Sequence, residues 1–325
     1  MDILTLIIRR VGYAAMLLLA VVVLNYILIN LAPGDIADTI AGDMGGATAE
    51  QMAEIRAEYG LDLPLWQQLF RYVSNVLQGD LGYSYFHTQP VTKLIAERLP
   101  ATLLLVITAQ LLALLVGTLL GVLAARKPNG WLSHAVTLIA LFGYSAPVFW
   151  TGIMLLIVFS LWIPIFPVAG MIDVTIEGGW WARALDIAKH MVLPVITLSS
   201  IFLALYSRLC RASMMEVLGS DYIRTARAKG LSESQIIMKH ALKNSLGPVV
   251  TLAGLQFSAV VSGAVLVETV FSWPGLGTLA LQSIIARDTP TIIGILFFSA
   301  MVVIVGNLLT DLALRLIDPR IRNRG

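Results

Sequence analysis

The sequence predicts an all-α membrane protein with six transmembrane helices, and three observations support this fold class. The 325 residues are 58% hydrophobic and 13% charged, whereas soluble domains average about 25% charged residues, and the mean hydropathy is +0.83. Six stretches reach the roughly 20 apolar residues that a membrane helix needs. Lysine and arginine are concentrated in alternate connections between these stretches. This composition, with a net charge of +2, excludes a disordered chain, an ordinary soluble enzyme and a nucleic-acid-binding protein with a basic surface.

The six spans can be placed from the apolar runs. They cover residues 11–31, 102–124, 135–161, 191–208, 248–267 and 291–312. The third is longer than one crossing requires, so we expect a tilted or kinked helix there. The fourth is the weakest prediction because Pro194 and three hydroxyl residues dilute its apolar character. Pro147 lies in the third span, where proline removes a backbone hydrogen bond and can kink the helix.

We expect the first span to be a retained anchor. Arg9 and Arg10 followed by an apolar run would also suit a cleaved signal peptide. A signal peptide, however, has an apolar core of about 7–15 residues, whereas this run has about 20. The run ends in Asn30-Leu-Ala-Pro-Gly34, which has no small-x-small cleavage pattern.

The distribution of charge orients the chain. If the N-terminus is inside, the inside segments carry 15 of the 22 lysines and arginines, while 14 of the 20 acidic residues lie outside. The short connection at Arg126-Lys127 is basic, and the basic block from Arg208 to Lys243 lies inside only if the fourth span is real. The positive-inside bias therefore predicts a multi-pass protein with both termini in the cytoplasm.

This topology divides the chain into three parts. Residues 1–31 form an N-terminal transmembrane helix, residues 32–100 form an extracytoplasmic helical segment, and residues 101–325 form a core of five transmembrane helices. The core includes a cytoplasmic loop at 209–247.

The extracytoplasmic segment carries signals for short helices. Thr48-Ala-Glu-Gln51 is a capping box for a helix that ends near Tyr59. Pro64 suits a first helical position, and apolar residues then recur every three or four positions until Gly79. A third short helix is predicted over 91–99. Two interpretations stay open for this segment: a cap packed on the span ends, and a docking face for an external partner.

The cytoplasmic loop begins with a short predicted helix. Gly219 interrupts the preceding helix, and Ser220 or Asp221 can cap a new one that continues to Lys229. Its basic end is well placed for the helix dipole. Gly230 then terminates it, since glycine adopts the left-handed conformation that ends many helices.

A second capping box, Ser232-Glu-Ser-Gln235, begins a helix that reaches about Asn244. In the first helix, Tyr222, Ile223 and Ala226 are expected on one face. Two interpretations stay open for that helix: it rests on anionic lipid headgroups, or it inserts into a groove of a cytosolic protein.

At these residues the chain resembles ABC importer permeases of the peptide/nickel branch. The resemblance rests on DYIRTARAKGL at 221–231, HALKNSL at 240–246 and PVVT at 248–251. The general loop signature of such permeases is Glu-Ala-Ala-x3-Gly-x9-Ile-x-Leu-Pro, which Ala226, Gly230 and Leu242 match. The departures are Arg224 for Glu, a loose match at Thr225, His240 for Ile and Lys243 for Pro, and these are typical of the peptide/nickel branch.

Further runs extend the resemblance over nearly the whole chain. They are NLAPGD at 30–35, GLDLP at 60–64, GDLG at 79–82, ETVFSWPGLG at 268–277 and DPRIR at 318–322. The resemblance implies the type I ABC importer permease fold and the first permease subunit of a dipeptide-type system in a bacterial inner membrane. Nickel complexes, glutathione and oligosaccharides are alternative substrates, because relatives of this branch carry them.

The resemblance also implies partners. A second six-span permease subunit, two cytosolic ATP-binding subunits, an extracytoplasmic substrate-binding protein and membrane lipid are expected around this chain. The sequence has no Gly-Lys-Ser or Gly-Lys-Thr run for a phosphate-binding loop. We therefore expect a non-catalytic subunit with no cofactor of its own, while separate ATPase subunits bind ATP and Mg²⁺.

The family likeness assigns the loop helix to coupling with the ATPase. The residues that it implies for this role are Asp221, Tyr222, Arg224, Thr225, Ala226, Ala228, Lys229, Gly230 and Leu231.

Polar and small residues inside the spans are candidates for the translocation pathway or the interface between permeases. They are Ser145, Gln256, Ser258 and Ser262. Gly117-x3-Gly121 in the second span favours close helix packing over pore lining. Glu268 and Asp311 fall near span ends, where a charge is expected at interface depth.

Two other classes of protein are weakly supported. A secondary transporter would need an inverted repeat and a central ionisable residue, and neither is visible. A membrane enzyme would need a catalytic or metal-binding constellation, but the histidines are scattered and no G-x-S-x-G motif occurs.

Overall fold

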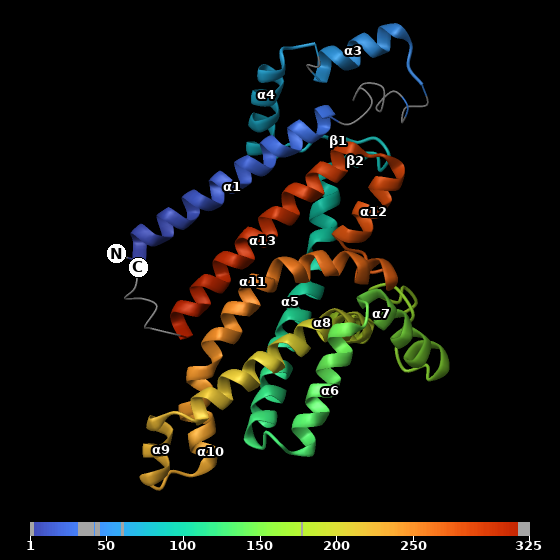
Figure 1. The fold of residues 1–325 in the computed structure, drawn as a ribbon. Helices are drawn as coiled ribbons and strands as arrows, with labels where there is room; N and C mark the ends of the chain where they lie inside the picture. The colour runs from blue at the N-terminus through green and yellow to red at the C-terminus, as the bar shows by residue number, and fades with distance from the viewer. Residues whose placement is uncertain (1–2, 32–41, 43–45, 60–61, 177, 318–325) are drawn as a thin grey trace. The chain divides into compact units, whose positions relative to one another are not determined.

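The computed structural model of the protein describes residues 3–31, 42, 46–59, 62–176 and 178–317. Figure 1 shows a helical chain with one short hairpin, in which β1 (Tyr83–Ser84) pairs antiparallel with β2 (Gln89–Pro90). The helices are α1 (Ile3–Leu31), α3 (Ala49–Tyr59), α4 (Leu65–Leu77), α5 (Val91–Arg126), α6 (Trp131–Ser145), α7 (Val148–Leu156), η1 (Ile157–Trp162), α8 (Trp180–Leu218), α9 (Asp221–Ala228), α10 (Glu233–Gln235), η2 (Ile236–Ala241), α11 (Leu242–Val270), α12 (Leu276–Ala286) and α13 (Thr289–Ile317).

The predicted fold class is confirmed. Among the described residues, five helical runs are long and apolar enough to cross a membrane. They lie in α1, α5, α8, the continuous run from α10 to α11, and α13. The bent pair of α6 with α7–η1 brings the number to six when it is taken as one span.

The third predicted span is broken at its proline. Trp131–Ser145 and Val148–Trp162 are bent by 106° relative to each other. Ala146 is extended, with ψ 131°, because the ring of Pro147 disfavours helical backbone in the preceding residue. The kink expected in 135–161 is therefore a sharp break between two short helices.

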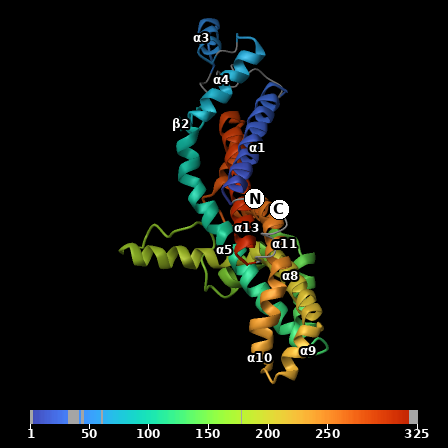
Figure 2. The same ribbon diagram turned by 90° about the vertical axis from the view of Figure 1, so that its left-hand side faces the viewer.

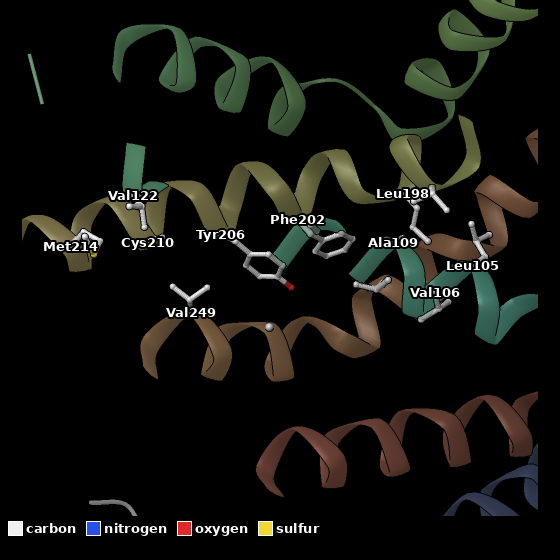
Figure 3. Close-up of a cluster of buried hydrophobic side chains, with 14 of the residues drawn as sticks. Leu105, Val106, Ala109, Val122, Leu198, Phe202, Tyr206, Cys210, Met214 and Val249 are labelled. Carbon is white, nitrogen blue, oxygen red and sulfur yellow. The ribbon is translucent and has the colours of Figure 1, made fainter. Parts of the chain in front are cut away.

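Two compact units make up the chain, one of residues 1–100 with 278–304 and one of residues 101–277 with 305–325. In the second unit, α5, α8 and α11 enclose an apolar core that Figure 3 shows in close-up. Tyr206 of α8 is fully buried there. The amide Nε2 of Gln110 donates to the Tyr206 hydroxyl at 3.1 Å and to the Ala253 carbonyl at 3.1 Å, so one side chain joins three helices.

The Gly117-x3-Gly121 pair packs α5 closely against α8, as predicted. A Cβ atom at Gly121 would lie 2.6 Å from Cβ of Cys210 and 2.7 Å from the Ser207 carbonyl oxygen. At Gly117 it would lie 2.9 Å from the Leu203 carbonyl oxygen. Small residues let helix backbones approach in lipid, where van der Waals packing and not apolar burial drives association.

Gly121→Ala is expected to destabilise the protein by about 1–3 kcal/mol, since an extra methyl in a close-packed contact forces backbone shifts. The thermal unfolding midpoint of the purified complex measures this loss. The matched control is Gly12→Ala in α1, where a Cβ meets nothing within 4 Å. Equal midpoints for the two variants would contradict the prediction.

In the first unit, the predicted capping box is confirmed. The Thr48 backbone N–H donates to Oε1 of Gln51 at 2.8 Å, and the Gln51 N–H donates to Oγ1 of Thr48 at 3.3 Å. Helix α4 begins after Pro64, and Gly79 follows it with φ +82°. The predicted helix over 91–99 is not separate, because α5 runs through Pro100 without interruption.

Hydrogen bonds hold parts of the first unit together. The Ser84 hydroxyl donates to Oδ2 of Asp288 at 2.5 Å, and Thr291 also donates to this buried carboxylate. The hairpin is thereby tied to the first turn of α13. Figure 2 shows α1 beside this part of α13, and Nδ2 of Asn25 donates to the Ile293 carbonyl at 3.5 Å.

Candidate functional site

Helix α9 of the loop has one buried face and one exposed face. Ile223 is fully buried and Ala226 is 7% exposed, and both belong to the apolar core together with Ile236 and Ile237 of η2. The expectation that Tyr222 shares their face is wrong, because Tyr222 is 46% exposed. The other exposed residues of the predicted set are Asp221, Arg224, Thr225, Ala228, Lys229 and Gly230, while Leu231 is half-buried.

The ends of α9 are formed by backbone turns. Helix α8 ends at Leu218, as Gly219 predicted, and Ser220 is the N-cap of α9. The Ser220 hydroxyl does not cap the helix but donates to the Val217 carbonyl at 2.6 Å. At the other end Gly230 has φ +78°, the left-handed conformation predicted for it.

Side-chain contacts brace the two arms of the loop. The Nε of Arg227 donates to Oε1 of Glu233 at 2.7 Å, and this hydrogen bond and charge lower the pKa of the Glu233 carboxyl. Asn244 donates through Nδ2 to the Tyr222 hydroxyl at 3.0 Å. The capping box of Ser232 and Gln235 is present, at 3.4 and 3.2 Å.

The second arm of the loop does not end near Asn244 as predicted. Helical structure is continuous from Glu233 through η2 to Val270. The π-helical turn at Ile236–Ala241 adds a residue without breaking the helix. The residues between Asn244 and Pro248 are helical, so the loop continues into α11 without a turn.

The loop lies at the same end of its unit as the connection between α5 and α6 (Figure 1). Arg211, near the end of α8, donates to the Pro128 carbonyl at 3.2 Å and to the Thr137 hydroxyl at 3.4 Å. The basic pair Arg126-Lys127 and the basic loop therefore share one end of this unit.

A carboxylate near the other end of α11 is buried within the protein. Glu268 lies close to the predicted span end, and its side chain is fully buried. The Thr102 hydroxyl donates to its Oε1 at 2.7 Å, and the Gly277 N–H donates to its Oε2 at 2.6 Å. Thr102 in turn accepts the Leu276 N–H at 2.7 Å, so the two side chains satisfy free backbone donors where α12 begins.

Neighbouring residues complete this buried network. The indole N–H of Trp273 donates to the Ala101 carbonyl at 2.9 Å, and the Trp273 backbone N–H donates to the Glu268 carbonyl at 2.8 Å. A Cβ at Gly275 would collide with the Glu268 carboxylate. The two glycines of Pro274-Gly-Leu-Gly277 allow their backbone to lie against the buried Glu268 carboxylate. They are the feature of the sequence that could have indicated this close approach.

The candidate pathway residues lie on two elements. Ser145 is exposed at the end of α6, next to the break at Pro147. On α11, Gln256 and Ser258 are half-buried and Ser262 is exposed.

The α11 face that carries Ser262 is lined with hydroxyl groups. Its members Thr251, Ser258, Ser262 and Thr269 recur at intervals of seven and four residues and are partly or fully exposed. Thr251, Ser262 and Thr269 each donate to the carbonyl four residues earlier, which leaves a weakly polar, uncharged face along the helix.

Comparison with known proteins matches both parts of the chain to one transport family. Residues 117–323 match the family described as the binding-protein-dependent transport system inner membrane component. Residues 3–106 match the N-terminal family of the same membrane components. The chain is a binding-protein-dependent ABC importer permease.

Curated relatives and solved structures agree with this membership. The permease is 39% identical to the dipeptide transport system permease protein DppB of Escherichia coli K12, over 98% of each chain. It is 38% identical to the di/tripeptide transport system permease protein DppB of Pseudomonas aeruginosa, over 99% of each chain. A putative peptide transport system permease protein of Brucella abortus is 39% identical, over 98% of each chain.

The fold is also that of a solved importer. Inward-facing structures of the MetNI methionine ABC transporter align with TM-scores of 0.51 and 0.54 at 16% and 18% identity. Each alignment covers 69% of the permease and 96% of the solved chain. Permeases of this family are non-catalytic membrane subunits that work with an ATPase and a binding protein.

Proposed function

We propose that this permease forms half of the translocation pathway of an ATP-driven importer for dipeptides and oligopeptides. The observation that carries the substrate class is the 39% identity, over 98% of each chain, to a dipeptide permease. The weakly polar and uncharged face of α11 supports this choice, because it can hydrogen-bond a peptide backbone without selecting a side-chain charge. Selectivity then resides mainly in the external binding protein.

The loop helix α9 is the part that seats in the ATPase. Its buried Ile223 and Ala226 anchor it to the permease, while Tyr222, Arg224 and Lys229 project outward. An amphipathic helix of this kind suits a groove on a partner protein. When two ATPase subunits bind ATP and Mg²⁺ and close, they move α9, and the continuous helix from Glu233 to Val270 carries that movement into the membrane.

The pathway is lined by the hydroxyl face of α11, together with Gln256 and with Ser145 beside the break at Pro147. A second permease subunit supplies the opposite wall. Rocking of α6 to α11 exposes this wall alternately to the two sides of the membrane, and the peptide passes from the binding protein into the opened cavity.

The permease lies in the inner membrane of a bacterial cell. Both of its termini are in the cytoplasm. The concentration of 15 of 22 basic residues in the inside segments supports this orientation. This orientation is also supported by the position of Arg126-Lys127 at the same end of the unit as the basic loop at 209–247. Arg211 donates a hydrogen bond to Pro128 in the connection between α5 and α6.

Uptake by the reconstituted complex tests this function. The permease, its partner permease, the ATPases and the binding protein are placed in proteoliposomes and supplied with labelled dipeptide, a nickel chelate, glutathione or a trisaccharide. We expect ATP-dependent uptake of the dipeptide and stimulation of ATP hydrolysis by the loaded binding protein. Uptake driven by a proton gradient without ATP would overturn the importer assignment, and preference for another solute would overturn only the substrate.

A further inference from the structure

Helix α4 of the extracytoplasmic segment has two apolar faces, and one of them is uncovered in the described structure. The covered face packs on α1: the Tyr26 hydroxyl donates to the Leu65 carbonyl at 2.9 Å, and the rings of Tyr26 and Tyr72 lie 6.1 Å apart. Val76 on this face is 8% exposed. The uncovered face consists of Trp66, Phe70 and Leu77, which are 69%, 75% and 81% exposed, and we call these three residues the α4 patch.

The α4 patch lies along one side of the helix, because its members are separated by four and seven residues. Polar side chains such as Gln67 and Gln78 occupy the remaining arc. The one charged residue from Leu65 to Leu77 is Arg71. The neighbouring helix α3, by contrast, exposes the charged residues Glu50, Glu54 and Arg56, which is typical of a helix surrounded by water.

The contact with Tyr26 sets the depth of α4. The apolar window of α1 runs from Val11 to Leu28, so Tyr26 lies in its last turn. Ile27 and Leu28 beside it are 45% and 49% exposed. Only 11% of this window is buried within the described chain. Helix α4 therefore meets α1 where the apolar surface of the span reaches the headgroup boundary.

We propose that α4 is an interfacial helix whose α4 patch lies in the outer leaflet of the membrane. Three features select lipid as the occupant: attachment of α4 to the last turn of the apolar window of α1, nearly complete absence of charge on α4, and aromatic side chains at this level, where tryptophan is enriched. Amphipathic helices with one apolar side bind at this level with that side in the acyl boundary. The extracytoplasmic segment is thereby held against the membrane beside the span end.

Spin labels on α4 test this arrangement in the assembled importer in nanodiscs. Single cysteines replace Trp66, Phe70 or Leu77, with Gln67→Cys and Gln78→Cys as matched controls on the polar arc. Cys210→Ala removes the buried native thiol, and any cysteines of the partner chains are replaced as well. Collision of each label with oxygen, which dissolves in lipid, and with a water-soluble nickel chelate is measured by power saturation. We expect an oxygen-to-nickel ratio several-fold higher at the three patch positions than at both controls.

Equal ratios at all five positions would overturn the proposal, since the α4 patch would then face water. Patch labels that lose nickel contact only after the binding protein is added would also overturn it, and would make this surface a protein-docking face. The assignment of the α4 patch to the outer leaflet rests on the proposed orientation of the termini. A membrane-impermeant thiol reagent applied to Gln78→Cys in intact cells tests that orientation separately, because the labels report lipid contact in either leaflet.

Discussion

Gly230→Val is expected to reduce dipeptide uptake and binding-protein-stimulated ATP hydrolysis at least about tenfold. Gly230 has φ +78°, where a residue with a side chain costs roughly 1–2 kcal/mol and a β-branched residue is a genuine outlier. A difference of 1.4 kcal/mol is a factor of about ten in an equilibrium. We expect the strain to change the turn between α9 and α10, and so to change the direction in which α9 would present its exposed face to the ATPase in the proposed coupling role.

A matched control separates this effect from the loss of any glycine in the loop. Gly219 precedes α9 with φ −83°, and a Cβ there meets its nearest atom at 3.5 Å, an ordinary contact. Gly219→Val should therefore retain coupling. Membrane insertion and copurification of the ATPase are measured for both variants, and full activity of a correctly inserted Gly230→Val permease would remove α9 from the coupling role.

Glu268→Ala is expected to lower the stability of the permease by roughly 2–6 kcal/mol. The substitution leaves the Thr102 hydroxyl and the Gly277 N–H without their buried acceptor, and each unsatisfied buried donor costs about 1–3 kcal/mol. The stability of Glu268→Gln should lie between that of Glu268→Ala and that of the native protein. The amide keeps one acceptor oxygen, but its new NH₂ group faces a hydrogen-bond donor. The measurement is the thermal unfolding midpoint of the purified complex, together with uptake at a temperature where the variant stays folded.

The control for this prediction is an exposed glutamate on the same unit. Glu216→Ala in α8 removes a side chain of the same size from an exposed position, so no comparable loss is expected. If Glu268→Ala unfolded at the same temperature as Glu216→Ala, the carboxylate would not be what holds the start of α12.

Local features of the fold were predictable because they depend on neighbouring residues. Both capping boxes, at Thr48 and at Ser232, form as their S/T-x-x-Q spacing predicts. Gly79 and Gly230 adopt positive φ at predicted helix ends. The fold class followed from apolar run length, since a bilayer imposes a fixed length on each span.

Features that depend on distant packing were predicted less well. The sequence predicts a kink in the third span, which Pro147 produces, but it does not give the 106° angle between two short helices that both contact α8. The burial of Glu268 is not apparent from the sequence around it, because it depends on the backbone near Gly275 and Gly277, which lies against the carboxylate. The prediction that Tyr222 lies on the buried face of α9 is wrong. Its exposed hydroxyl instead accepts a hydrogen bond from Asn244, which lies 22 residues later in the chain.

The sequence by itself determined the membrane class, the places of the apolar runs and the position of a basic loop beside two glycine turns. It could do so because bilayer thickness, charge sidedness and helix capping act on contiguous residues. Only the tertiary structure decided that Glu268 is a buried hydrogen-bond acceptor and that α11 continues unbroken into the loop. Those outcomes depend on groups that are distant in the sequence, such as Thr102 and Glu268, which are 166 residues apart. The positions of such distant residues in the sequence do not show which of them come into contact in the folded chain.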